Sequence, residues 1–198
     1  MNILHYSLGL YPHRSGGLNR YATDLMMEQS REHNVAILYP CGYRWWRRKC
    51  YVSQSSNFGS ISVYKMINSH PIPLLFGIRR PGSFVNKDVS IESFTQLYED
   101  FHPEVLHLHT LMGMPEGVLA YFKERGVRIV YTTHDYFGIC PKVNLINQSG
   151  LACEGPDEKR CMMCNSNAPY PFFLRLRNSS LAFIFRDLVQ WIKNMKRF

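Results

Sequence analysis

The chain has 198 residues, of which 45% are hydrophobic, and its formal net charge is +8. A chain of this length can bury a core of its own, so its stability does not require disulfides or a metal. The positive charge favours anionic partners, such as nucleotide phosphates, nucleic acid or an acidic membrane surface. No apolar run of about 18 residues and no secretory leader is present, which predicts a cytoplasmic protein. In that compartment the six cysteines are expected as free thiols or metal ligands.

The first stretch predicts a strand, a glycine turn and a helix. Residues 2–10 (NILHYSLGL) are expected to form the strand, and apolar residues at helical spacing follow from Leu18 to Met26. Gly16 and Gly17 lie between them, where a glycine backbone can approach a ligand closely and a helix N-terminus favours a phosphate. Because the spacing is not that of the G-x-G-x-x-G motif, the pair either helps bind a ligand or is only a turn.

The middle of the chain predicts further strands and helices. Residues 33–39, 60–66 and 105–111 are strand-like, and helices are expected after Ser90 and Pro115. The aromatic and basic residues 41–51 (CGYRWWRRKCY) are interpreted as an exposed loop, although such a mixture can also bind bases or a membrane. Alternating strands and helices predict an α/β fold with a doubly wound parallel sheet.

Histidines mark the end of the strand at residues 105–111. His107 and His109 are two residues apart, so they share one face of the sheet. A metal site here would need further ligands, and we therefore interpret the pair as part of a cleft wall.

The stretch from residue 127 to 164 contains the residues that we expect to form the functional site. Its β-branched start predicts a buried strand, which ends at His134 and Asp135. Ligands of open α/β sheets bind beyond the carboxyl ends of the strands. The sequence therefore predicts the functional site at this histidine and aspartate pair.

Four cysteines follow in the same loop, with the spacing C-x12-C-x7-C-x2-C. They predict a four-thiolate structural zinc site, because a Cys-x-x-Cys turn lets two sulfurs share an ion and two further thiols complete a tetrahedron. Free or oxidised thiols and an iron–sulfur cluster are the alternatives. The expected ligands are Cys140, Cys153, Cys161 and Cys164.

The C-terminal residues 166–198 predict a basic amphipathic helical tail. Apolar positions recur at helical spacing, and basic residues greatly outnumber acidic ones. Such a helix can lie on a membrane surface or can cover the sheet. We therefore divide the chain into residues 1–165, which include the cysteine-rich loop 136–165, and this tail.

Four motifs follow one another along the chain: NILHYS, the Ser-Gly-Gly turn, PEVLHLHTL and VRIVYTTHDYFGICP. In this order they resemble the N-terminal, acceptor-side domain of family 4 glycosyltransferases with the GT-B fold. The Asp-x4-Cys-Pro element from Asp135 to Pro141, with its trailing Cys-x-x-Cys, is similar to enzymes that build bacterial surface polysaccharides. The fold implied is Rossmann-like, one half of a GT-B enzyme.

The resemblance also implies roles for the site residues. His134 would contact the donor sugar as the catalytic candidate, and Gly16 and Gly17 would approach the donor diphosphate. His109, and with it Asp135, would belong to the substrate-binding surface. The implied partners are a nucleotide-sugar donor and a glycan or lipid-linked acceptor, with no catalytic metal and retention of anomeric configuration. Separately, the basic tail predicts a peripheral membrane contact, and the lack of a recognised motif argues against nucleic acid.

The family's Glu-x7-Glu element and its diphosphate-binding basic pair belong to a C-terminal domain that these residues do not contain. The chain alone is therefore expected to be inactive, as a truncated enzyme, one half of a split enzyme or a degenerate copy. The alternative is a non-catalytic binding or regulatory module on the same fold, with a structural zinc site.

Overall fold

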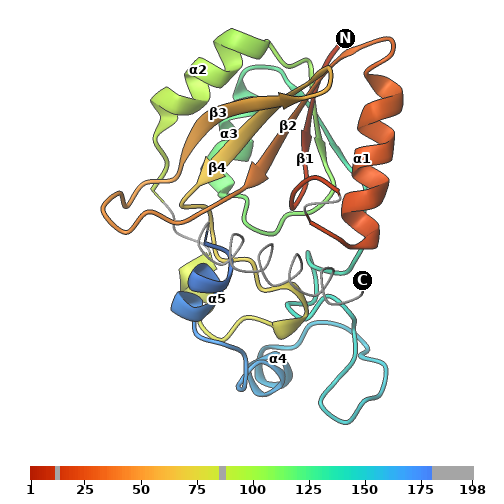
Figure 1. The fold of residues 1–198 in the computed structure, drawn as a ribbon. Helices are drawn as coiled ribbons and strands as arrows, with labels where there is room; N and C mark the ends of the chain where they lie inside the picture. The colour runs from red at the N-terminus through yellow and green to blue at the C-terminus, as the bar shows by residue number, and fades with distance from the viewer. Residues whose placement is uncertain (12–13, 85–87, 180–198) are drawn as a thin grey trace, which may run out of the picture.

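A six-stranded sheet forms the centre of the computed structural model, which describes residues 1–11, 14–84 and 88–179 (Figure 1). The strand order is β3-β4-β2-β1-β5-β6. All neighbouring strands are parallel except β3 and β4, which form an antiparallel hairpin. This confirms the predicted α/β doubly wound sheet. The strands are β1 (Asn2–Tyr6), β2 (Asn34–Pro40), β3 (Tyr51–Phe58), β4 (Ile61–Ile67), β5 (Val105–Leu108) and β6 (Arg128–Tyr131).

Helices cover both faces of the sheet. On one face, α1 (Gly17–Gln29) places Met26 against Val35 and Ile37. On the other face, α2 (Ile91–Phe101) and α3 (Glu116–Glu124) bury Phe94 and Phe122 against strand residues. Because side chains alternate along a strand, residues at even and odd positions of β1 belong to different faces. This parity determines which side chains reach the site below.

Two strands differ from the sequence predictions. The hairpin strand β3 was missed because it is largely polar (YVSQSSNF) and lies at the sheet edge, where burial imposes no apolar alternation. Strand β6 was predicted to be buried but is the opposite edge, and Val130 is 38% exposed. Its β-branched residues correctly indicate a strand, but such residues do not indicate whether a helix covers that strand.

A smaller substructure lies beyond the carboxyl ends of the parallel strands (Figure 1). It contains the short 3-10 turns η1 (Leu74–Phe76) and η2 (Pro81–Phe84), and the helices α4 (Glu158–Cys164) and α5 (Pro171–Arg177). The side-chain oxygen of Asn165 accepts a hydrogen bond from the Ile78 backbone N–H at 2.8 Å. Gly77 has φ +79°, and any Cβ there would collide with that same oxygen. The end of α4 is thus fixed to the segment between η1 and η2, where the positive φ of Gly77 disfavours any other residue.

The predicted tail is only partly described. Helix α5 belongs to it, whereas its amphipathic continuation beyond residue 179 lies outside the described residues. Among the residues that are described, no helix is both long and apolar enough to span a membrane.

Candidate functional site

Histidines from neighbouring strands meet at the carboxyl edge of the sheet. In the parallel register of β1 and β5, His5 lies directly beside His107. His109 follows two residues later on the same face, which is the face that α1 covers. His5 and His109 are buried, and His107 is half-buried. Strand pairing and side-chain parity therefore gather three imidazoles at one place.

Hydrogen bonds join these imidazoles into a line. His5 Nε2 lies 2.8 Å from Gln29 Oε1, and its Nδ1 lies 3.0 Å from His109 Nε2. His109 Nδ1 in turn lies 3.3 Å from His134 Nε2. We call Gln29, His5, His109 and His134 the histidine row. It runs from the last turn of α1 to the loop after β6.

His107 lies beside this row rather than in it. Its ring stacks on that of His109 with 4.4 Å between ring centroids, and its Nε2 lies 2.8 Å from Thr132 Oγ1. Ligand nitrogens of His5, His107 and His109 lie within 4.8 Å of one another, the only such group of three among the described residues. However, both nitrogens of His5 and of His109 already have hydrogen-bond partners. These contacts leave His5 and His109 no free ring nitrogen for a metal ion.

Burial without a counter-charge keeps the row neutral. Desolvation lowers the pKa of His5 to about 4, helped by repulsion from His107, and lowers the pKa of His109 to about 3, helped by the neighbouring histidines. Burial also lowers the pKa of His134, although the adjacent Asp135 opposes the shift. At neutral pH each imidazole therefore has one N–H donor and one acceptor nitrogen.

Tyr21 connects the row to the glycine turn. Its ring lies edge-on to those of His134 and His109, with centroid distances of 4.9 and 6.0 Å. Tyr21 lies one turn into α1, which begins at Gly17. Gly16 has φ +129°, which disfavours other residues, and a Cβ on Gly17 would meet no atom within 4 Å. The predicted turn thus lies at the same edge as the histidines and has open space beside it.

An open cavity of about 470 Å³ adjoins His134. Asp135 lines it as well, but its Oδ1 accepts a hydrogen bond from the Phe137 backbone N–H at 2.9 Å and so shapes the loop. The described residues offer Nδ1 of His134 no hydrogen bond, so this nitrogen is available to a ligand. The full lining is Tyr131, Thr133, His134, Asp135, Tyr136, Gly138 and Ile139.

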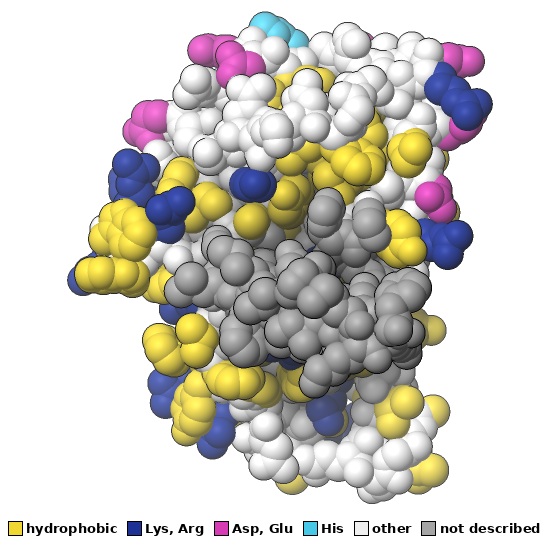
Figure 2. All heavy atoms as spheres, viewed as in Figure 1, with side chains coloured by type: hydrophobic (Ala, Val, Ile, Leu, Met, Phe, Trp, Pro, Cys, Tyr) yellow, Lys and Arg dark blue, Asp and Glu magenta, His cyan; other side chains and the backbone are white. Residues whose placement is uncertain are grey.

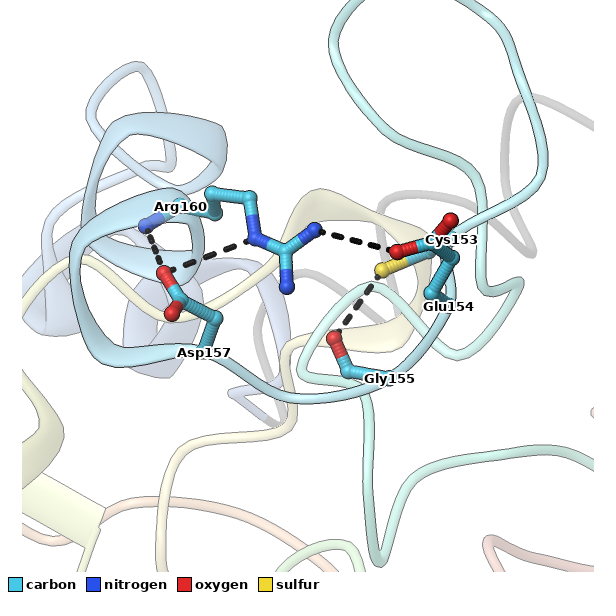
Figure 3. Close-up of polar contacts among 5 residues, drawn as sticks. All are labelled: Cys153, Glu154, Gly155, Asp157 and Arg160. Atoms are coloured by element: carbon cyan, nitrogen blue, oxygen red, sulfur yellow. Dashed lines mark hydrogen bonds and ion pairs between the residues drawn. The ribbon is translucent and has the colours of Figure 1, made fainter.

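The four predicted zinc ligands line a second cavity, of about 310 Å³. Helix α4 carries Cys161 and Cys164 one turn apart, and Asp157 caps this helix by accepting from the Arg160 backbone N–H at 2.8 Å. The Arg160 guanidinium also approaches Asp157 and Glu154, at 3.5 and 3.8 Å (Figure 3). These contacts hold the segment of Cys153 beside α4.

The sulfurs are nevertheless not drawn together as a metal would require. Cys153 donates its thiol hydrogen to the Gly155 carbonyl at 3.2 Å (Figure 3). All four thiols are half-buried, and no three of them form a group with ligand atoms within 4.8 Å. Zinc would bind only after this loop contracted, since zinc–sulfur bonds are about 2.3 Å long.

Sequence reasoning found part of this site. It identified His109 and His134, which are in direct contact, and it placed the glycine turn at the same edge. It missed three contributors, Gln29, His5 and Tyr21. His5 could have been found because it lies at an odd position of β1, a strand expected to be buried, where a polar ring needs a partner. Tyr21 was assigned only to the apolar face of its helix, and Gln29 carried no signal, because a glutamine near a helix end is ordinarily a surface residue.

Comparison with known protein families matches residues 15–192 to the model described as Glycosyltransferase Family 4. The match covers most of the chain. No curated protein and no solved structure gives a significant match.

The neutral row predicts that the protein loses stability in mild acid. Between the depressed pKa values of His5 and His109 and the unfolded value near 6.5, the unfolded chain binds more protons. The free energy of unfolding should therefore fall as pH drops from about 6.5 to about 4, by on the order of 1 kcal/mol per pH unit for each group. Urea unfolding at a series of pH values measures this.

Two variants test the assignment to the row. His5→Gln removes one titrating group, so it should flatten the pH dependence even if it lowers stability overall. His33→Gln, outside the cluster, should leave the slope unchanged. An identical slope in His5→Gln and the wild-type protein would contradict the prediction.

Proposed function

Because the chain belongs to glycosyltransferase family 4, we propose that it forms the acceptor-side half of a GT-B glycosyltransferase. In this proposal a sugar moves from a nucleotide diphosphate to an acceptor hydroxyl, with retention of configuration, between this domain and a donor-binding domain. The family match over residues 15–192 carries the proposal. The open carboxyl edge of the sheet, where a ligand of such a fold binds, supports it.

Each site residue then has a role. His134 contacts the donor sugar from the cavity that it lines, and His109 holds the His134 ring by the 3.3 Å contact. Gly16 and Gly17 leave room for the donor diphosphate beside the start of α1, where the helix dipole favours negative charge. Asp135 fixes the loop and faces the same cavity.

The acceptor is a growing polysaccharide or a lipid-linked glycan. This part rests on the resemblance of the Asp-x4-Cys-Pro element to enzymes of bacterial surface polysaccharides. The net charge of +8 suits such acceptors where they carry phosphate. A non-catalytic module on the same fold is the alternative, and the transfer assay below separates the two.

Replacing His134 should impair transfer. In the chain combined with a donor-binding domain, His134→Ala should lower kcat/KM for sugar transfer by about 10- to 100-fold, the usual cost of one lost hydrogen bond in a closed site. His102→Asn is the control. His102 is exposed and ends α2 before the start of β5, at the opposite edge of the sheet from His134, and Asn tolerates its left-handed backbone. Full activity in His134→Ala would remove the assigned role, and no transfer by the wild-type pair would favour the binding module.

We also propose that the four cysteines bind one structural zinc ion. They line a single cavity, and α4 already presents two of them from adjacent positions. The loop has little apolar content, so metal binding would supply folding free energy and fix the segment that follows His134.

Elemental analysis tests the zinc site. Protein purified without chelator should contain about one zinc ion per chain, the stoichiometry of a closed four-thiolate site. Cys161→Ser should abolish the metal, whereas Cys41→Ser, a half-buried thiol outside the loop, should retain it. Metal-free wild-type protein with four reactive thiols and an ordered loop would rule out the site.

A peripheral membrane contact is the last part of the proposal. Aromatic and basic side chains gather around the β2–β3 loop and α5 (Figure 2). Trp45 and Phe172 are 78% and 72% exposed. Arginines lie over nearby rings, linking three segments into one aromatic-basic surface: Arg175 over Tyr43, Arg177 over Phe76, and Arg79 and Arg80 over Tyr170. Exposed rings among arginines suit the interface of an anionic membrane.

Vesicle co-sedimentation tests this contact. Binding to vesicles rich in phosphatidylglycerol should exceed binding to phosphatidylcholine and should weaken as salt rises, because each basic residue contributes about 1 kcal/mol near the surface. The double variant Trp45→Ser/Trp46→Ser should bind more weakly. Met162→Ser/Met163→Ser, an exposed apolar pair on α4, should not. Equal binding to both kinds of vesicle would contradict the proposal.

A further inference from the structure

The histidine row extends away from the cavity, and its far end has no part in the function proposed above. His134 lines the cavity, whereas His5 and Gln29 do not. His5 is fully buried, and its two ring nitrogens are both engaged, one with His109 and one with Gln29. Burying a polar ring costs stability unless its nitrogens are hydrogen-bonded, so the partners of His5 determine which of its nitrogens carries the proton.

The direction of the hydrogen bonds follows from Gln29. Its Oε1 can only accept, so His5 must donate from Nε2, 2.8 Å away. A neutral His5 then has an unprotonated Nδ1, which must accept from His109 Nε2–H at 3.0 Å. His109 Nδ1 is accordingly an acceptor and receives the Nε2–H of His134 at 3.3 Å. Each neutral ring carries its proton on Nε2, and the pattern propagates from α1 to the cavity.

We infer that Gln29, His5 and His109 are positioning residues that hold His134 in the single tautomer with a protonated Nε2 and an unprotonated Nδ1. The free nitrogen at the cavity is then an acceptor. It suits a ligand that donates a hydrogen bond, such as a hydroxyl, and does not suit a phosphate or carbonyl oxygen. Reading that ligand as a sugar hydroxyl rests on the proposed function, whereas the tautomer itself does not.

The surroundings of the row favour neutral rings. The His107 ring is tilted against that of His5 and stacked on that of His109, with ring centroids 5.1 and 4.4 Å away. A proton on either of these rings would be repelled once His107 was charged. Tyr21 packs edge-on to His109 and His134. Asp135, next to His134, is the acidic group that acts on the row, and it acts on the ring that is most open to solvent. Burial lowers the pKa of both inner histidines, which is consistent with neutral rings.

Nitrogen-15 NMR of the imidazoles tests the inference on the 198-residue chain without any ligand. At pH 8, two-bond proton–nitrogen spectra should show a single Nε2–H tautomer for His5, His109 and His134. Gln29→Met removes the acceptor at similar size, so His134, two imidazoles away, should lose its single tautomer and populate the Nδ1–H form as well.

The controls separate this effect from general damage. Gln54→Met makes the same change at an exposed position of β3 and should leave every histidine signal unchanged. Backbone amide spectra report whether each variant is folded. A wild-type His134 protonated on Nδ1, or a His134 tautomer that ignores Gln29→Met in the folded protein, would overturn the inference. Neither result depends on sugar transfer, so the transferase proposal would stand or fall separately.

Discussion

The hydrogen bond between His5 and His109 is the contact on which the rest of the site depends. It joins two buried imidazoles on adjacent parallel strands, and it can form only if both rings are neutral or share one proton. Because His5 also contacts Gln29, the same bond couples the sheet to the last turn of α1. That helix carries Tyr21 over the outer rings and begins at the glycine turn. The site is therefore a property of how α1 packs on β1 and β5.

The loop after His134 is held by a different kind of contact. Val143 packs with Leu8, Ile72 and Met112 beyond the end of the sheet, and its carbonyl accepts from the Tyr136 backbone N–H at 3.2 Å. The cysteine-rich segment is held at its end by Asn165, whose side-chain oxygen accepts from the Ile78 backbone N–H. The same oxygen leaves no room for a Cβ on the neighbouring Gly77. A rigid sheet edge thus meets a loop fixed at a few points.

Much of the fold follows from the sequence because burial leaves a regular trace. Helices α1, α2 and α3 and the parallel strands follow from apolar spacing, and the chain order of strands and helices determines the parallel sheet. Strand β3 shows no such pattern, because it lies at the sheet edge and most of its residues are polar and do not pack in a core. Only part of the histidine row could be predicted. The spacing of His107 and His109 shows that they share a face of the sheet. The register that places His5 beside them is a long-range property of the sheet, which the sequence does not indicate. Gln29 could not be recognised, because its role comes from where α1 ends and not from its residue type.

The role of His134 is tested most directly by a structure of the chain joined to a donor-binding domain, with an intact nucleotide sugar bound. We expect a hydroxyl of the donor sugar within hydrogen-bond distance of His134 Nδ1, while His134 Nε2 keeps its contact with His109. A sugar bound elsewhere, with His134 free of it, or a His134 ring turned away from His109 toward the ligand, would contradict the account.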